Sequence, residues 1–154
     1  MISITRRYRF SASHRLHTAE LSGAENAQLY GKCNNPFGHG HDYILEVTAT
    51  GPVNAASGLI LPIAKLDRLV DEQVLRMFAS RNINLDVPQF QALVPTTENI
   101  AGVIAQLIQG AWDSYIGDPA VNLIRVHVQE TDRNGFEILT PQNDFQSESA
   151  HVHA

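Results

Sequence analysis

The chain of 154 residues contains one cysteine, one tryptophan and an excess of acidic over basic residues. A single cysteine, Cys33, cannot form a disulfide within the chain, so the fold does not depend on one. The net charge of −5 supplies no basic surface for nucleic acid. No apolar run approaches the roughly 18 residues of a membrane span. We therefore expect a protein that binds neither nucleic acid nor a membrane.

The length fits one domain, and no repeat or linker interrupts residues 1–140. Residues 1–10 lack the apolar block of a signal peptide, which favours a cytoplasmic location. Residues 141–154 are polar and aperiodic, and we expect a flexible C-terminal tail there. We interpret His151 and His153 in this tail as an adventitious pair and not as a specific metal site.

Hydrophobic patterning predicts four strands and two helices in the order ββααββ, which indicates an α+β fold. The elements are expected as strands at 2–10 and 41–51, helices at 63–78 and from Thr96 or Thr97 to about Gly117, and strands at 121–131 and 136–140. The polar connection at 17–38 is rich in Gly and Asn and is long for a hairpin loop. Such loops in compact domains are usually functional or disordered.

The stretch "GKCNNPFGHGH" places two histidines, His39 and His41, at the start of the second predicted strand. Residues two apart on a strand point to the same side, so both imidazoles can reach one cation. His14 ends the first predicted strand, and pairing of the two strands would bring it beside them. Three neutral imidazoles with one open position describe a catalytic zinc site. The alternative is a turn whose histidines are simply hydrogen-bonded or exposed.

Two further hypotheses concern the roles of Cys33 and Glu130. A lone cysteine is usually a small buried hydrophobe, but Cys33 lies in a polar loop, and positive charge from Lys32 or from a metal would lower the pKa of the thiol. Glu130 shares strand parity with Val126 and Val128, which would place a carboxylate on an apolar face. Such a carboxylate needs partners, such as two adjacent N–H groups of a guanidine-like ligand. A solvated strand end is the alternative.

Together, "FSASHRL", "LYGKCNNPFGHGHDY", "NLDVPQF", "TTENIA" and "VQETD" resemble, in order and spacing, the 6-pyruvoyl-tetrahydropterin synthase family. This family includes the 6-carboxytetrahydropterin synthases of queuosine biosynthesis. The match covers roughly residues 4–139. The resemblance implies a tunnelling fold (T-fold), in which an antiparallel sheet packs on two helices. The sheets of neighbouring subunits would join into barrels, typically in a homo-hexamer made of two trimers.

The resemblance also implies an activity and a set of site residues. The activity is a zinc-dependent lyase reaction on 7,8-dihydroneopterin triphosphate, giving 6-pyruvoyl-tetrahydropterin and triphosphate without nicotinamide or flavin. The pocket would lie at a subunit interface. The implied residues are His14, His39 and His41 as zinc ligands, Cys33 as the catalytic thiol, Glu130 as the pterin anchor, and Thr96 and Thr97 as further pocket residues. We expect the Glu130 carboxylate to face the pterin ring and not the ion.

One departure from the family pattern concerns proton transfer. Where the family has an Asp-His pair before "NLD", this chain has Ala79 and Ser80. His17 could replace that pair, whereas strand parity places His127 on the opposite face from Glu130. Three interpretations stay open: the synthase; a related enzyme, such as a 6-carboxytetrahydropterin synthase or a side-chain lyase; and a zinc- and pterin-binding paralogue of low activity. No glutamate lies between Cys33 and His41, which disfavours the side-chain lyase.

Overall fold

The computed structural model describes residues 1–141, so the predicted tail with His151 and His153 lies outside the described residues. The strands are β1 (Ile2–His14), β2 (His39–Gly51), β3 (Arg81–Asn82), β4 (Asn122–Thr131) and β5 (Asn134–Leu139). The α-helices are α1 (Gly23–Tyr30), α2 (Ile63–Val70), α3 (Arg76–Phe78), α4 (Ile83–Asp86) and α5 (Thr97–Ile116). The remaining turns are the 3-10 helices η1 (Gly31–Asn34) and η3 (Pro88–Gln91) and the π-helical turn η2 (Asp71–Leu75).

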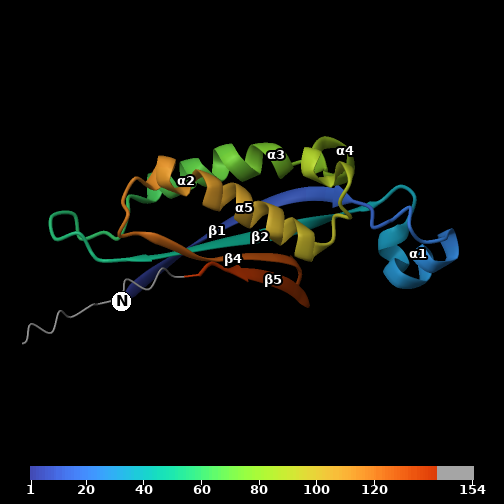
Figure 1. The fold of residues 1–154 in the computed structure, drawn as a ribbon, viewed down its shortest axis with the longest axis horizontal. Helices are drawn as coiled ribbons and strands as arrows, with labels where there is room; N and C mark the ends of the chain where they lie inside the picture. Colours follow the sequence, from blue (N-terminus) through green and yellow to red (C-terminus); the bar gives the residue numbers. More distant parts are fainter. Residues whose placement is uncertain (142–154) are drawn as a thin grey trace, which may run out of the picture.

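The strands form one sheet in the order β3-β1-β2-β4-β5. All neighbours are antiparallel except the short β3, which runs parallel to β1. Helices α2, α3 and α5 lie along one face of this sheet, and α1 lies beyond one end of it (Figure 1). The other face carries no helix in the described chain. This architecture confirms the predicted α+β class and the helices on a single face.

The core fills the space between the sheet and the two long helical segments. On β2, Tyr43, Leu45 and Val47 are fully buried, as the alternation in the sequence predicts. The helices contribute the expected apolar stripes, which include Leu66 on α2 and Ile104 on α5. Burial of one stripe per helix and one face per strand is what holds the two layers together.

Three segments differ from their sequence-based prediction, and one of them is residues 81–91, where β3, α4 and η3 form although no element was predicted. The predicted helix at 63–78 is interrupted by the π-helical turn η2, which separates α2 from α3. The predicted connection at 17–38 contains α1, whose first turn is closed by a capping box between Ser22 and Glu25. The fully buried Asn26 then ties α1 to the preceding loop, because its side chain bonds the backbone N–H and carbonyl of Thr18.

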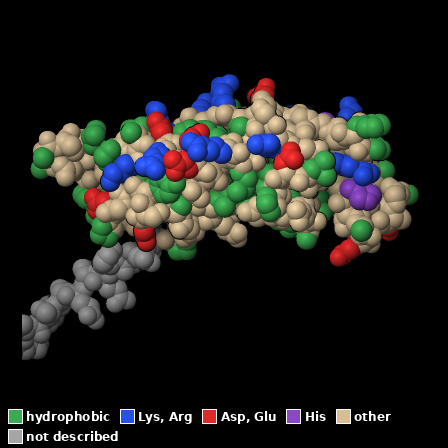
Figure 2. All heavy atoms as spheres, turned by 90° about the horizontal axis from the view of Figure 1, so that it is seen from above, with side chains coloured by type: hydrophobic (Ala, Val, Ile, Leu, Met, Phe, Trp, Pro, Cys, Tyr) green, Lys and Arg blue, Asp and Glu red, His purple; other side chains and the backbone are tan. Residues whose placement is uncertain are grey.

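Acidic and basic side chains alternate along the helix-covered face, and histidine side chains reach the surface at the end that carries α1 (Figure 2). Ion pairs such as Arg68 with Glu72 and Arg76 with Asp71 belong to this face. Among the described residues, no helix combines the length and the apolar composition that crossing a membrane would require.

Candidate metal centre

Three histidines meet where β1 ends and β2 begins. His14 is the last residue of β1 and His39 the first of β2, and the two are direct cross-strand partners. Their Nε2 atoms lie 3.2 Å apart. His41 follows two residues later on the same face, and one ring nitrogen from each histidine lies within 4.8 Å of the others. The predicted strand pairing therefore brings the three imidazoles together as expected.

The hydrogen bond from His14 Nδ1 to the backbone turns its Nε2 toward the other two histidines. His14 is 1% exposed, and its Nδ1 donates to the carbonyl of Pro95 at 2.8 Å. The proton on Nδ1 directs the lone pair of Nε2 toward the cluster, which is how a metal-binding histidine is normally held. The Nε2 of His41 is buried and has no hydrogen-bond partner in the described chain. A cation bound between the three rings would supply the partner that His41 Nε2 lacks.

The spacing and the protonation of these rings fit a zinc ion. Two nitrogens bound to tetrahedral zinc at their usual bond lengths are about 3.3 Å apart, close to the 3.2 Å observed for His14 and His39. Burial lowers the pKa of His14, and burial followed by the charge of His41 lowers the pKa of His39. Both rings are thus kept neutral near pH 7, which is the form that binds metal.

Gly38 allows the loop before β2 to pass close to β1. Its φ is +68°, and a Cβ at this position would lie 2.6 Å from the carbonyl oxygen of His14. A side chain would therefore clash with backbone and strain the left-handed conformation at once. The glycine directly before His39 is thus a condition for bringing His39 and His14 together.

Glu130 contributes a carboxylate to the same cluster. Its Oε1 lies 3.6 Å from the Nε2 atoms of both His14 and His41, and its side chain is 12% exposed. It shares a face with the fully buried Val126 and Val128, as strand parity predicts. Its Oε1 points toward two of the three imidazoles, and its predicted contact with a pterin ring stays a prediction.

Cys33 lies in η1 and is partly buried. The backbone N–H of Leu16 donates to its carbonyl at 2.8 Å, which holds this turn against the chain leaving β1. Burial raises the pKa of the thiol, and the negative charge of Glu130 raises it further. The lowering of the thiol pKa that Lys32 predicted is not found, because Lys32 is exposed and both partial burial and Glu130 act in the opposite direction.

The start of α5 is tied to the cluster through Pro95. Thr96 is the N-cap of α5 and accepts a hydrogen bond from the backbone N–H of Asn99, which decides between the two capping candidates. Thr97 follows as the first helical residue and is 4% exposed.

The sequence did not predict a role for Pro95, whose backbone carbonyl orients His14, because a backbone carbonyl is the same in every residue type. The sequence also did not place Tyr43 beside the metal centre, although its hydroxyl lies 3.5 Å from His14 Nδ1. Tyr43 is two residues after His41 on the same strand face, and this spacing could have indicated the contact.

The segment that replaces the Asp-His pair forms a tight turn at the edge of the sheet. Ser80 is exposed, has a φ of 59°, and donates its backbone N–H to the carbonyl of Ser11. His127 lies on the opposite face, 3.6 Å from Glu46, which agrees with the parity argument against it. His17 accepts a hydrogen bond at Nδ1 from the side-chain amide of Asn34, the residue after Cys33.

His17 also lines a cavity of about 400 Å³ together with Asn84 and Pro95. Because its Nδ1 accepts from Asn34, the neutral ring carries its proton on Nε2. Pro95 borders this cavity and also holds His14, so the cavity adjoins the backbone that supports the metal centre.

The 6-pyruvoyl tetrahydropterin synthase family model matches residues 3–141 of this chain. The chain belongs to the 6-pyruvoyl tetrahydropterin synthase family. It is 41% identical over 131 residues to the human 6-pyruvoyl tetrahydrobiopterin synthase, covering 85% of this chain and 86% of the human one. The corresponding protein of Poecilia reticulata is 40% identical over 132 residues, covering 85% of each chain.

A solved structure of the Caenorhabditis elegans 6-pyruvoyl tetrahydropterin synthase has a TM-score of 0.81 and 37% identity to this chain. The alignment covers 91% of this chain and 96% of the other. These matches confirm both the resemblance to the 6-pyruvoyl tetrahydropterin synthase family and the T-fold that it implies.

Proposed function

We propose that this protein is a zinc-dependent 6-pyruvoyl-tetrahydropterin synthase of the cytoplasm, a lyase that releases triphosphate from 7,8-dihydroneopterin triphosphate. The observation that carries the proposal is the convergence of three imidazole nitrogens within 4.8 Å of one another, in a chain about 40% identical to named synthases. The neutral state of His14 and His39 and the unpartnered Nε2 of His41 support the metal assignment.

In this proposal His14, His39 and His41 hold the zinc ion. Bound zinc would polarise the side-chain hydroxyls of the substrate and acidify the protons on the neighbouring carbons. Pro95 fixes the tautomer of His14 from the start of α5, and Gly38 keeps His39 within reach. The chain's own contribution is therefore a pre-organised set of three imidazole ligands.

Glu130, Thr96 and Thr97 would hold the pterin ring. A carboxylate can accept two parallel hydrogen bonds from adjacent N–H groups of the pterin, which fixes the ring in one orientation. Glu130 extends toward the metal centre from β4, and the two threonines follow Pro95 directly. This arrangement supports a ring bound beside the ion, with the substrate side chain directed at it.

Cys33 would take and return the protons that the substrate loses during the rearrangement. Its raised pKa means that the free thiol carries its proton near pH 7, so it needs a base or the charge of the ion to become a thiolate. With Ala79 and Ser80 in place of the Asp-His pair, a water molecule, Ser80 or His17 has to assist. The hydrogen bond from Asn34 to His17 favours His17, because it links this ring to the residue next to Cys33.

We further propose that the protein works as a homo-hexamer of two trimers with the site at a subunit interface. The five-stranded sheet is open, with β3 and β5 as edge strands among the described residues. Three large apolar side chains on segments near the site are strongly exposed: Phe37 (96%), Leu85 (75%) and Leu29 (63%). Unpaired edges and exposed apolar side chains are features that neighbouring subunits would cover.

The test is a turnover assay with zinc-loaded protein and 7,8-dihydroneopterin triphosphate, with Cys33→Ala as the control. We expect release of triphosphate and a 6-pyruvoyl product with the natural chain, and at least about a hundredfold slower release with Cys33→Ala. Tight pterin binding without release would instead identify a binding paralogue of low activity, the outcome that the missing Asp-His pair favours. Absence of both release and pterin binding would contradict the proposal.

A further inference from the structure

The segment that leaves β1 after His14 is held from two sides by asparagine side chains. Asn84 on α4 pairs with both backbone groups of Arg15: its Oδ1 accepts from the Arg15 N–H at 2.8 Å, and its Nδ2 donates to the Arg15 carbonyl at 2.9 Å. From the other side, Asn34 Nδ2 donates to the carbonyl of Leu16 at 2.7 Å. Side-chain amides therefore satisfy the backbone of this segment at the point where the strand has ended.

Four hydrogen bonds join the turn that carries Cys33 to the same segment. The Cys33 carbonyl accepts from the Leu16 N–H at 2.8 Å, and the Asn34 carbonyl accepts from Arg15 Nε at 3.2 Å. The amide of Asn34 supplies the other two, to the Leu16 carbonyl at 2.7 Å and to His17 Nδ1 at 3.1 Å. Three of the four bonds thus involve Asn34, and its amide uses both of its N–H donors.

The Cys33 thiol is close enough to the metal centre for charges to act between them. Its pKa is raised by burial and then by the negative charge of Glu130, whose Oε1 lies 3.6 Å from His14 Nε2. Burial, Glu130 and Cys33, in that order, raise the pKa of Tyr43, whose hydroxyl lies 3.5 Å from His14 Nδ1. Because Asn34 ties the turn to the residues that follow His14, it also ties the thiol to the metal centre.

We propose that Asn34 is the positioning residue of Cys33: its amide holds the thiol-bearing turn against the segment after His14 and so fixes the place of the thiol beside the metal centre. The inference rests on the proposed function for the proton transfer that the thiol performs, but the placement of the thiol does not depend on that function. A carboxylate at position 34 accepts hydrogen bonds and donates none, so it would face the Leu16 carbonyl without a bond.

The first experiment measures the rate at which iodoacetamide alkylates zinc-loaded protein at pH 7, and Cys33 is the one cysteine that can react. Asn34→Asp removes the amide donor and adds a negative charge. Asn35→Asp is the matched control, because it adds the same charge one residue later and its oxygen can still accept from the Phe37 N–H, as Asn35 Oδ1 does at 3.1 Å. We expect Asn34→Asp to react at least about threefold faster than Asn35→Asp, since a loosened turn exposes the partly buried thiol.

Asn34→Ala removes the amide without adding a charge, and it replaces Asn34→Asp if that variant does not fold. We expect it to react at least about threefold faster than the natural chain. Circular dichroism and metal analysis should show the fold and the zinc content of the natural chain in every variant, because no histidine is changed. Equal alkylation rates in Asn34→Asp and Asn35→Asp, or in Asn34→Ala and the natural chain, would overturn the inference.

The second experiment follows turnover of 7,8-dihydroneopterin triphosphate and separates placement of the thiol from a general loosening of the pocket. We expect Asn34→Ala to lower kcat by at least about tenfold and to change KM by less than about twofold, because the amide acts on the thiol and not on the bound substrate. A raised KM with unchanged kcat would contradict the positioning role. If the natural chain releases no triphosphate, the proposed function fails, and the alkylation rates alone decide this inference.

Discussion

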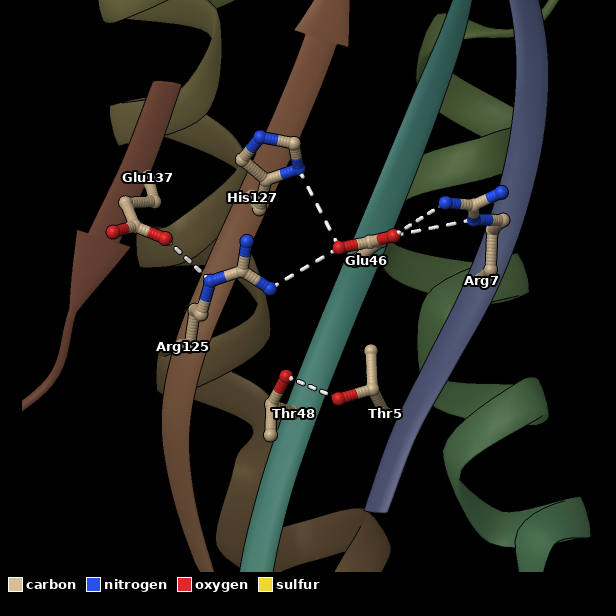
Figure 3. A network of polar contacts seen from close by, with 7 residues as sticks. All are labelled: Thr5, Arg7, Glu46, Thr48, Arg125, His127 and Glu137. Carbon is tan, nitrogen blue, oxygen red and sulfur yellow. Dashed lines mark hydrogen bonds and ion pairs between the residues drawn. The ribbon is translucent and has the colours of Figure 1, made fainter. Parts of the chain in front are cut away.

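Two polar clusters lie on opposite faces of the same sheet, and they are built in different ways. The imidazole cluster, made of His14, His39, His41 and Glu130, faces the helices at one end of β1 and β2. The charge network lies on the face without helices and is drawn in Figure 3, where its side chains stand in front of the strands and the helices lie behind. It consists of Arg7, Glu46, Arg125, His127 and Glu137, with the pair Thr5 and Thr48 beside it.

The acidic and basic groups of the charge network pair with one another. Arg7 donates to one oxygen of Glu46 at 2.8 Å, and Arg125 donates to the other at 3.1 Å. Arg125 also donates to Glu137. The hydrogen bond from Arg7 is the largest of the influences that lower the pKa of Glu46. Positive and negative groups alternate across the four strands β1, β2, β4 and β5, so this arrangement is complete without a ligand.

The imidazole cluster contains no arginine or lysine that could neutralise its carboxylate. Three ring nitrogens and a carboxylate converge, and the Nε2 of His41 has no hydrogen-bond partner within the described part of the chain. His127 Nδ1 is also unpartnered there, but it lies 3.6 Å from a carboxylate that two arginines already neutralise. The difference teaches that convergent ring nitrogens, one of them buried without a partner, indicate a binding site, whereas alternating charges indicate structure.

The largest expected effect is loss of the metal from the imidazole cluster. His39→Ala or His41→Ala should reduce zinc from about one ion per chain to almost none, because two remaining imidazoles hold zinc far more weakly than three. Metal analysis after dialysis measures this. His127→Ala, the equivalent change in the charge network, should keep its zinc. Full zinc content in both His39→Ala and His41→Ala would refute the metal assignment.

A smaller effect is expected from the glycine that supports the cluster. Gly38→Ala forces a Cβ to within 2.6 Å of the His14 carbonyl and strains a residue with φ +68°, so we expect a loss of about 2–3 kcal/mol in the free energy of unfolding and weaker zinc binding. Gly58→Ala is the matched control, since its φ is +71° but no atom lies within 4 Å of the added Cβ. It should cost only about 1 kcal/mol and leave zinc affinity unchanged. Equal effects of the two substitutions would argue against the close approach.

The smallest effect concerns the charge network. The pKa of Glu46 is lowered in the folded protein, so its ion pairs stabilise the fold above the pKa of the unfolded chain. That stabilisation is lost as the pH falls through the lowered folded-state pKa. Glu46→Gln should therefore cost about 1 kcal/mol at pH 7, and the difference from the natural chain should shrink as the pH falls below about 4.

Urea unfolding followed across pH measures this difference, and zinc content should not change with the substitution. A difference that stays constant from pH 7 to pH 3 would contradict the assigned role of the Glu46 ion pairs.

Much of the site follows from local rules that the sequence displays. Two-residue periodicity places His39 and His41 on one face and Glu130 on the face of Val126, and both placements agree with the structure. The register that pairs His14 with His39 follows from β1 and β2 running antiparallel over their full length.

The remainder depends on contacts between residues far apart in the chain. The carbonyl of Pro95 meets His14 across 81 positions, and no pattern of residue types encodes that contact. The direction of the Glu130 side chain and the raised pKa of the Cys33 thiol likewise depend on burial that arises only in the folded chain. The helix α1 could have been predicted from the capping box of Ser22 and Glu25, but the polar composition of residues 17–38 concealed it.

The most direct test of the central claim is X-ray absorption spectroscopy of the zinc-loaded protein without pterin. The account predicts one zinc ion per chain with imidazole nitrogens at about 2.0–2.1 Å and no sulfur neighbour, since Cys33 serves as a thiol and not as a ligand. A sulfur neighbour at about 2.3 Å, or zinc without imidazole ligands, would contradict the assignment of His14, His39 and His41 as the metal centre and of Cys33 as the proton-transferring group.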